Sequence, residues 1–176
     1  MRKLTQMPTL AERCANIELL VLDVDGVLSD GSITYGGADV ELKAFHVRDG
    51  SGLKLWTAAG KRAAIVSGRE SAAVTRRAGE LGIDLVFQGV QDKLAALDSI
   101  LATARLGPKQ TAAIGDDVPD LPVFRAIGLA VAVADACPEV RCAAHHVTQA
   151  RGGRGGVREV IELVMRCQGI WQLSTC

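Results

Sequence analysis

Short apolar runs that end in a glycine or a polar turn alternate along this chain with segments in which apolar residues recur at helical spacing. The clearest run is Leu19-Leu20-Val21-Leu22, in a segment that ends at Asp23. A short apolar run that stops at a turn signal predicts a buried strand. The same reasoning predicts six strands in all: 17–23, 62–66, 84–87, 111–114, 128–133 and 146–148.

The segments between these runs have the pattern of helices. In 93–106, Leu94, Leu97 and Ile100 share one face, and Gly107-Pro108 ends the segment. Strands that alternate with helices predict an α/β fold, a Rossmann-like doubly wound parallel sheet with helices on both faces. The predicted helices are 8–16, 53–59, 71–81, 93–106, 118–127, 137–143 and about 157–168.

Residues 31–47 have a different pattern. Two partly alternating segments lie on either side of Gly36-Gly37, which predicts a β-hairpin. Because this hairpin directly follows the acidic end of the first strand, we expect it to fold over that end as a flap. No linker separates two domains, so we expect residues 1–176 to form a single domain. Its parts include a leading segment 1–16, a flap at about 31–47 and a C-terminal helix at about 157–168.

Composition and charge narrow the function. The 20 basic and 20 acidic residues cancel and aromatic residues make up only 3%, so we expect no nucleic-acid partner. Five widely spaced cysteines without a C-x-x-C pair predict a reduced, cytoplasmic protein. The first residues lack the apolar core of a signal peptide, and no stretch is long and apolar enough to span a bilayer, so we expect no membrane association.

Polar residues that could bind a ligand or take part in a reaction follow several of the predicted strands. Asp23 and Asp25 end the first strand, Ser67 ends the second, Lys93 begins a helix, and Asp116 ends the strand 111–114. Ligands of open parallel sheets bind at the carboxyl ends of the strands, so we expect these side chains to lie together. Carboxylates are costly to desolvate without a cation, and Mg²⁺ prefers oxygen ligands together with substrate phosphate.

The residue types suggest distinct roles. Asp23 and Asp116 could bind Mg²⁺, and a carboxylate kept ionised beside Mg²⁺ and Lys93 could attack phosphorus. Asp25 could protonate the leaving alkoxide and later activate water. Ser67 and Lys93 could hold the phosphoryl oxygens.

These residues occur in motifs that resemble those of the haloacid dehalogenase-like phosphatases, in the same order. The resemblance implies that Asp23 is a nucleophile that forms an aspartyl-phosphate and that Asp25 is the general acid and base. It also implies that Mg²⁺ is bound by Asp23, the backbone carbonyl of Asp25, and Asp116. The gaps between motifs are too short for a cap domain, and cap-less members usually cover their sites by oligomerising. The motifs are Asp23-Val24-Asp25-Gly26-Val27-Leu28, Val66-Ser67-Gly68-Arg69, Lys93 and Ile114-Gly115-Asp116-Asp117.

Three further runs are similar to the 3-deoxy-D-manno-octulosonate 8-phosphate (KDO 8-phosphate) phosphatases within this family. They are Asp30-Gly31-x-Ile33, Lys43-x-Phe45-His46-Val47-Arg48-Asp49-Gly50-x-Gly52 and Gly152-Gly153-x-Gly155-x-Val157-Arg158-Glu159-Val160. The resemblance implies a sugar-acid phosphate as substrate, a role in lipopolysaccharide inner-core synthesis, and a homotetramer in which a neighbour helps to close the site. Phosphatases of the nine-carbon acylneuraminate or deaminoneuraminate 9-phosphates share nearly all these motifs, so the length of the sugar stays open.

The roles of several residues around the strand ends also stay open. Ser67, Gly68, Arg69 and Lys93 are the expected substrate-binding residues, with Arg69 binding the sugar-acid carboxylate rather than an acidic neighbour near Glu70. Asp117 is either a partner of Asp116 or a helix N-cap. Arg154 is either an anion clamp or a solvated side chain. A non-catalytic phosphoacceptor module is disfavoured, because its acidic residues come from different strands.

Overall fold

A computed structural model of the chain describes residues 7–37 and 40–171. Its main sheet has six strands, all paired in parallel, in the order β5-β4-β1-β6-β7-β8. This arrangement confirms the predicted α/β fold, and each strand lies within one residue of a predicted segment or inside it. The strands are β1 Leu19–Leu22, β4 Arg62–Val66, β5 Leu85–Phe87, β6 Thr111–Gly115, β7 Leu129–Ala132 and β8 His146–Val147.

Strand β1 lies in the interior of the sheet, and all four of its residues are buried. Leu22 is aligned with Ile65 on β4 and with Ile114 on β6. The residues that follow these three strands therefore meet at one edge. Strands β4 and β5 lie on one side of β1, and β6, β7 and β8 lie on the other. In open α/β sheets, ligands bind at the carboxyl edge where the strand order changes direction in this way.

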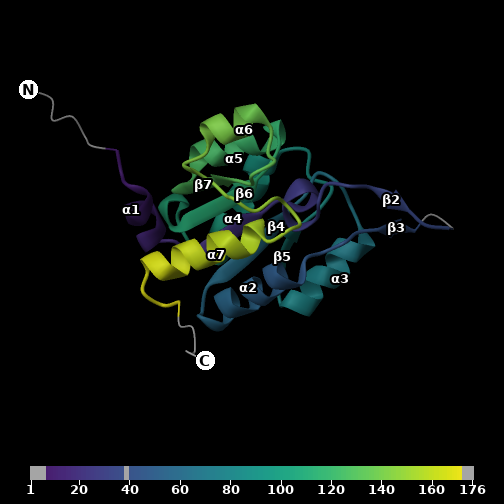
Figure 1. The fold of residues 1–176 in the computed structure, drawn as a ribbon, viewed down its shortest axis with the longest axis horizontal. Coiled ribbons are helices and arrows are strands. Elements are labelled where there is room, and N and C mark those ends of the chain that lie inside the picture. The colour runs from purple at the N-terminus through teal and green to yellow at the C-terminus, as the bar shows by residue number, and fades with distance from the viewer. Residues whose placement is uncertain (1–6, 38–39, 172–176) are drawn as a thin grey trace, which may run out of the picture.

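Helices cover both faces of the sheet (Figure 1). Helices α2 and α7 pack against each other with α1 beside α7, and α4 and α5 pack together on the opposite face. Within the described ranges, no helix has the length and apolar character needed to cross a membrane. The helices are α1 Leu10–Ala15, α2 Val47–Ala58, α3 Ala72–Leu81, α4 Lys93–Ala104, α5 Leu121–Ala126, α6 Pro138–Ala143 and α7 Gly156–Cys167.

Helix α2 begins six residues before the predicted start at Leu53, so that boundary was wrong. Gly50 and Gly52 lie in the segment that leads into the predicted helix 53–59. Both are instead buried inside α2, where a Cβ on Gly50 would lie 3.3 Å from Leu81 Cδ2 on α3. A Cβ on Gly52 would lie 2.9 Å from Arg158 Cδ on α7. The glycines therefore allow close helix packing rather than a turn.

The buried side chain of Asp49, on α2, caps the N-terminus of α7. Its carboxylate accepts hydrogen bonds from the backbone N–H of Gly155 at 3.1 Å and of Arg158 at 2.7 Å. The N-cap residue of α7 is Gly155, which has no side chain to do this. Asp49 thus satisfies N–H groups that a helix start leaves unpaired and fixes the glycine-rich loop before α7 to α2.

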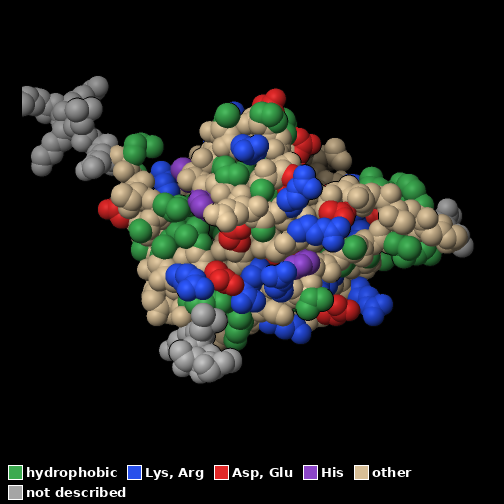
Figure 2. Space-filling view, viewed as in Figure 1, with side chains coloured by type: hydrophobic (Ala, Val, Ile, Leu, Met, Phe, Trp, Pro, Cys, Tyr) green, Lys and Arg blue, Asp and Glu red, His purple; other side chains and the backbone are tan. Residues whose placement is uncertain are grey.

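The flap consists of two short antiparallel strands, β2 Thr34–Tyr35 and β3 Glu41–Leu42, that project from the body of the molecule (Figure 1). It ends earlier than the predicted residue 47, because His46 is the N-cap of α2. Four apolar side chains on the flap are exposed, and Figure 2 shows apolar side chains gathered there. They are Ile33 (46% exposed), Tyr35 (72%), Val40 (50%) and Leu42 (53%).

Candidate active site

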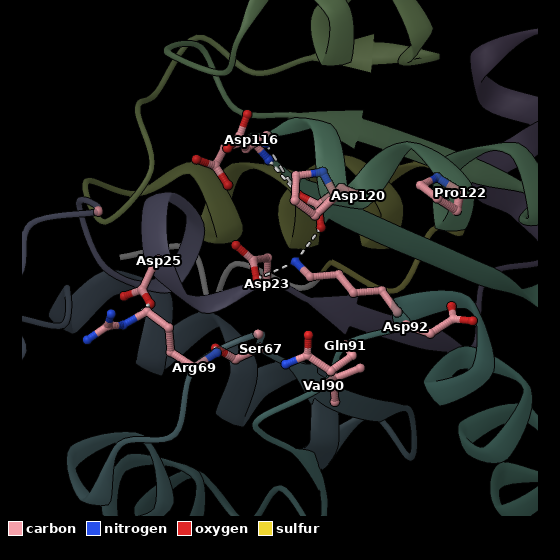
Figure 3. Close-up of a pocket in the computed structure, with 15 residues that line it drawn as sticks. Asp23, Asp25, Ser67, Arg69, Val90, Gln91, Asp92, Asp116, Asp120 and Pro122 are labelled. Atoms are coloured by element: carbon pink, nitrogen blue, oxygen red, sulfur yellow. Dashed lines mark hydrogen bonds and ion pairs between the residues drawn. The ribbon is translucent and has the colours of Figure 1, made fainter.

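A cavity of about 830 Å³ opens at the carboxyl edge of the sheet (Figure 3). It is reached by the ends of β1, β4 and β6 and by the first turn of α4. The structure brings together in this cavity all the residues that sequence analysis predicts for the site. These residues are Asp23, Asp25, Ser67, Gly68, Arg69, Lys93 and Asp116.

Asp23 continues β1, with its backbone N–H donating to the carbonyl of Ile114 at 3.2 Å. Its Oδ1 lies 2.8 Å from the Nζ of Lys93, and both side chains are only 11% exposed. Burial raises the pKa of Asp23 to about 6, while the charge of Lys93 acts in the opposite direction. Burial also disfavours the charge of Lys93, but its two carboxylate neighbours outweigh burial and leave its pKa raised. Lys93 therefore keeps its positive charge beside Asp23.

The second carboxylate at Lys93 is Asp120, which sequence analysis missed. Its Oδ1 lies 2.6 Å from Lys93 Nζ, and its Oδ2 accepts the backbone N–H of Asp116 at 3.0 Å. Gly115 permits this approach, since a Cβ there would lie 2.4 Å from Asp120 Oδ2. The sequence signal that could have identified Asp120 is its position as a third carboxylate, four residues after Asp116. Asp120 fixes the lysine and the backbone that carries Asp116.

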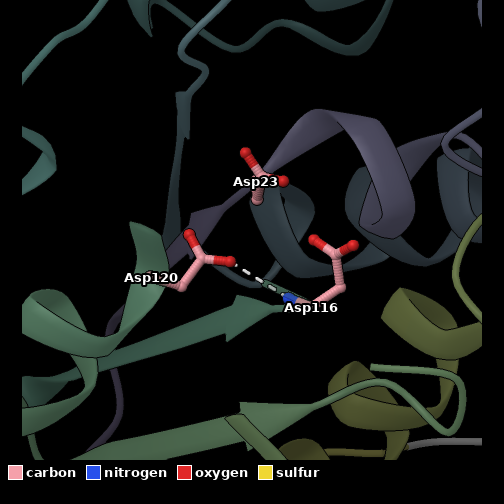
Figure 4. A group of neighbouring side chains, drawn as sticks. All are labelled: Asp23, Asp116 and Asp120. Atoms are coloured by element: carbon pink, nitrogen blue, oxygen red, sulfur yellow. Dashed lines mark hydrogen bonds between the residues drawn. The ribbon is translucent and has the colours of Figure 1, made fainter. Parts of the chain in front are cut away.

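Carboxylate oxygens of Asp23, Asp116 and Asp120 lie within 4.8 Å of one another, in an arrangement that could hold a metal ion (Figure 4). Within residues 7–37 and 40–171, the buried Asp116 Oδ1 has no hydrogen-bond partner. Burial, and next the charge of Asp23, raise the pKa of Asp116 to about 8. An unpartnered buried oxygen in a cluster of carboxylates suits a hard divalent cation. Since both oxygens of Asp120 are engaged, Asp23 and Asp116 are the better ligands.

The turn Val24–Leu28 after β1 positions Asp25 and Gly26. Gly26 has φ +93°, and a Cβ on it would lie 2.0 Å from Asp116 Oδ2. A glycine is needed there for both reasons. The Asp25 carboxylate points away from Asp116, toward Arg69 (Figure 3). It pairs with the ammonium of Lys43 and accepts from Ser29 Oγ at 3.3 Å.

Ser67, Gly68 and Arg69 follow β4. The buried Oγ of Ser67 accepts the backbone N–H of Arg69 at 3.2 Å, which leaves the hydroxyl hydrogen for a phosphoryl oxygen. Arg69 Nη2 lies 2.6 Å from Glu41 Oε2 on the flap. Arg69 therefore has an acidic partner, but this partner comes from the flap and not from the vicinity of Glu70.

The glycine-rich loop before α7 supports the turn that carries Asp25. The backbone N–H of Gly153 donates to Val27 O at 2.8 Å, and a Cβ on Gly152 would lie 1.6 Å from Gly26 O. Arg154 in this loop is 65% exposed and pairs with Asp30 at 3.1 Å.

Asp117 is an N-cap. Its carboxylate accepts the backbone N–H of Val118 at 2.8 Å, at the start of the short 3₁₀ turn Val118–Asp120. The same residue also lines the cavity beside Asp116.

Comparison with known proteins identifies the family. The haloacid dehalogenase-like hydrolase family matches residues 83–161. A 3-deoxy-D-manno-octulosonate 8-phosphate phosphatase from Yersinia pestis is 49% identical over 157 residues, which cover 89% of this chain and 84% of the relative. The chain belongs to the haloacid dehalogenase-like hydrolases.

Solved structures of related hydrolases have the same fold. The crystal structure of the KDO 8-phosphate phosphatase from Yersinia pestis has a TM-score of 0.89 at 48% identity, covering 91% of this chain and 86% of the other. The enzyme from Moraxella catarrhalis, crystallised with magnesium, phosphate and KDO, has a TM-score of 0.88 at 42% identity, covering 90% and 91%. The motif resemblance, the cap-less fold and the assignment to an enzyme of the phosphatase type are thereby confirmed.

Proposed function

We propose that this hydrolase removes phosphate from KDO 8-phosphate with Mg²⁺ as cofactor. The observation that carries the proposal is the cavity that gathers Asp23, Asp25, Ser67, Lys93 and Asp116 at one sheet edge. Relatives that are 45–49% identical over most of the chain are KDO 8-phosphate phosphatases. The Moraxella catarrhalis relative, which was crystallised with magnesium, phosphate and KDO, supports both the cofactor and the substrate.

Three groups would hold Mg²⁺: the side chains of Asp23 and Asp116 and the backbone carbonyl of Asp25. The unpartnered Oδ1 of Asp116 and its raised pKa support this assignment. When bound, Mg²⁺ offsets the negative charge of the carboxylates and the phosphoryl group.

The chain's own residues account for both chemical steps. An oxygen of Asp23 attacks phosphorus, the ester P–O bond breaks, and its electron pair leaves with the sugar oxygen, which takes a proton from Asp25. Asp25, now ionised, takes a proton from water as that water attacks the aspartyl-phosphate. This second step releases inorganic phosphate and restores Asp23 and the protonated Asp25.

Four residues would bind the substrate. The Ser67 hydroxyl, the Gly68 backbone N–H and the Lys93 ammonium would contact phosphoryl oxygens, with Lys93 held in place by Asp120. Arg69 would bind the sugar-acid carboxylate, because the planar guanidinium group suits a carboxylate. In this structure the Arg69 guanidinium already pairs with the carboxylate of Glu41.

We further propose that the whole chain forms one domain and assembles as a homotetramer in which a neighbour closes the site. The open cavity without a cap, and the exposed apolar side chains of the flap, support such an assembly. The four cysteines within the described residues are free thiols, which supports a reducing cytoplasm. The proposed substrate would make this a step in lipopolysaccharide inner-core synthesis.

A side-by-side assay tests the substrate. Phosphate release from KDO 8-phosphate and from the two nine-carbon 9-phosphates is measured with Mg²⁺ and with excess chelator. We expect the highest kcat/KM for KDO 8-phosphate and no turnover with chelator. A preference for a nine-carbon substrate would identify an acylneuraminate or deaminoneuraminate 9-phosphate phosphatase. Stable phosphorylation without turnover, by protein shown to be folded, would instead indicate a phosphoacceptor.

A further inference from the structure

Lys43 lies directly after β3 on the flap, and its side chain is only 1% exposed. Its ammonium pairs with Asp25 Oδ1 and lies 3.0 Å from Glu41 Oε1. Lysine is almost never fully buried unless it is paired. The two carboxylates therefore explain why this side chain turns inward from an otherwise exposed hairpin.

Arg69 completes a closed ring of alternating charges. Its Nη2 lies 2.6 Å from Glu41 Oε2, and its Nε lies 3.8 Å from Asp25 Oδ2. Two members, Glu41 and Lys43, come from the flap, and the other two follow β1 and β4. The ring, defined by Asp25, Lys43, Glu41 and Arg69, thus fastens the flap to the strand ends that build the site.

The contacts in this ring differ in strength. Arg69 is 43% exposed, and solvent weakens an ion pair at that exposure. The Lys43–Asp25 pair is shielded and has hydrogen-bond geometry, while the Arg69–Asp25 separation exceeds a hydrogen bond. Lys43 is therefore the group that fixes the Asp25 carboxylate.

The two oxygens of Asp25 are consequently not equivalent. Oδ1 accepts from Lys43 and from the hydroxyl of Ser29, whereas among the described residues the only partner of Oδ2 is the more distant Arg69. Oδ2 is thus the oxygen that can carry a proton to the leaving group. Lys43 itself is not among the residues that line the cavity, so it acts on the reaction through Asp25.

We propose that Lys43 is a positioning residue that orients Asp25 for proton transfer only while the flap is seated on the site. The inference rests on the proposed acid and base role of Asp25. It adds Lys43 as a residue that this role requires, and it requires that the flap be seated on the site. Flap seating and catalysis are then coupled, because withdrawal of the flap removes the group that holds Asp25.

The test compares Lys43→Met and Lys43→Arg with wild type on KDO 8-phosphate. We expect Lys43→Met to lower kcat by about 10-fold or more, which is part of the roughly 10²–10⁴-fold that a general acid contributes, with little change in KM. Lys43→Arg keeps the charge and should recover part of kcat. Lys109→Met is the matched control, because Lys109 is exposed at the opposite edge of the sheet. If Lys43→Met does not fold, the Glu41→Gln, Lys43→Met double variant replaces it in the test. The double variant removes one negative and one positive charge, so the net charge is unchanged.

A double-mutant cycle separates positioning from other roles. In an Asp25→Asn background, Lys43→Met should cause almost no further loss, because the group through which Lys43 acts is already disabled. A full additional loss, an unchanged kcat in the single variant, or a raised KM with kcat intact would each overturn the proposal. If the wild type hydrolyses another alkyl phosphate but not KDO 8-phosphate, the proposed substrate fails, and the same cycle on that alkyl phosphate still tests Lys43.

Discussion

Gly26 controls how closely the turn that carries Asp25 approaches Asp116. Replacing Gly26 with Ala introduces a Cβ 2.0 Å from Asp116 Oδ2 at a φ of +93°. We expect Asp116 to move and activation by Mg²⁺ to weaken by about 10-fold or more, the usual scale for disturbed metal ligands. Titration of phosphatase activity with Mg²⁺ measures this effect.

Gly60→Ala is the control for backbone strain. Gly60 has φ +81°, but a Cβ there would meet nothing within 4 Å in the part of the chain that the structure describes. Both variants should lose about 1–2 kcal/mol of stability from the left-handed backbone alone. Equal Mg²⁺ activation in the two variants would show that contact with Asp116 does not matter.

At the residue scale, the sequence predicts the side chains whose roles follow from their place at strand ends. Asp23, Ser67 and Asp116 are such residues, and the cavity brings them together. Asp120 and Lys43 were not predicted as site residues. Their importance depends on contacts with Lys93 and Asp25, which lie 27 and 18 residues away in the chain. Apart from the position of Asp120 four residues after Asp116, neither residue has a local sequence pattern that reveals its partner.

At the scale of the element, α2 is the instructive case. Its glycines are inside a helix, where Ala is normally more favourable by about 1 kcal/mol. Gly52→Ala would place a Cβ 2.9 Å from Arg158 Cδ and 3.3 Å from Ile161 Cδ1. We expect this variant to lower the free energy of unfolding by about 1–3 kcal/mol, the typical cost of overpacking. Chemical denaturation measures the change.

Gly79→Ala is the matched variant for the same measurement. Gly79 lies in α3, and no described residue comes within 4 Å of a Cβ placed there. This variant should gain up to about 1 kcal/mol. Stabilisation by both substitutions would mean that the α2–α7 contact does not require glycine.

The two kinds of element differ in how far the sequence determines them. Buried strands such as β1 are specified by continuous apolar runs, and their positions were predicted to within one or two residues at each end. The start of α2 was wrong because glycine signals either a turn or close helix packing, and only the tertiary contact with α7 distinguishes the two. The flap ends just before the predicted residue 47 for a related reason, since His46 is the N-cap of α2 and Val47 is its first residue.

At the scale of the whole molecule, the exposed flap has a consequence for assembly. Ile33 and Val40 are 46% and 50% exposed. If a second copy covers them, the Ile33→Asp, Val40→Asp double variant should lower the mass in solution and reduce kcat/KM. Sedimentation equilibrium and the phosphatase assay measure these effects. Leu94→Asp on α4, at 37% exposure, is the control for mass. An unchanged mass in the double variant would show that the flap does not join subunits.

Transfer of the phosphoryl group to Asp23 is the central claim. Rapid acid quench during turnover of KDO 8-phosphate, followed by mass spectrometry of peptides, locates the transferred group directly. We predict a phosphoryl group on the peptide that contains Asp23, and neither that adduct nor turnover in Asp23→Asn. Turnover that survives in Asp23→Asn, or a phosphoryl group on a different residue, would contradict the account.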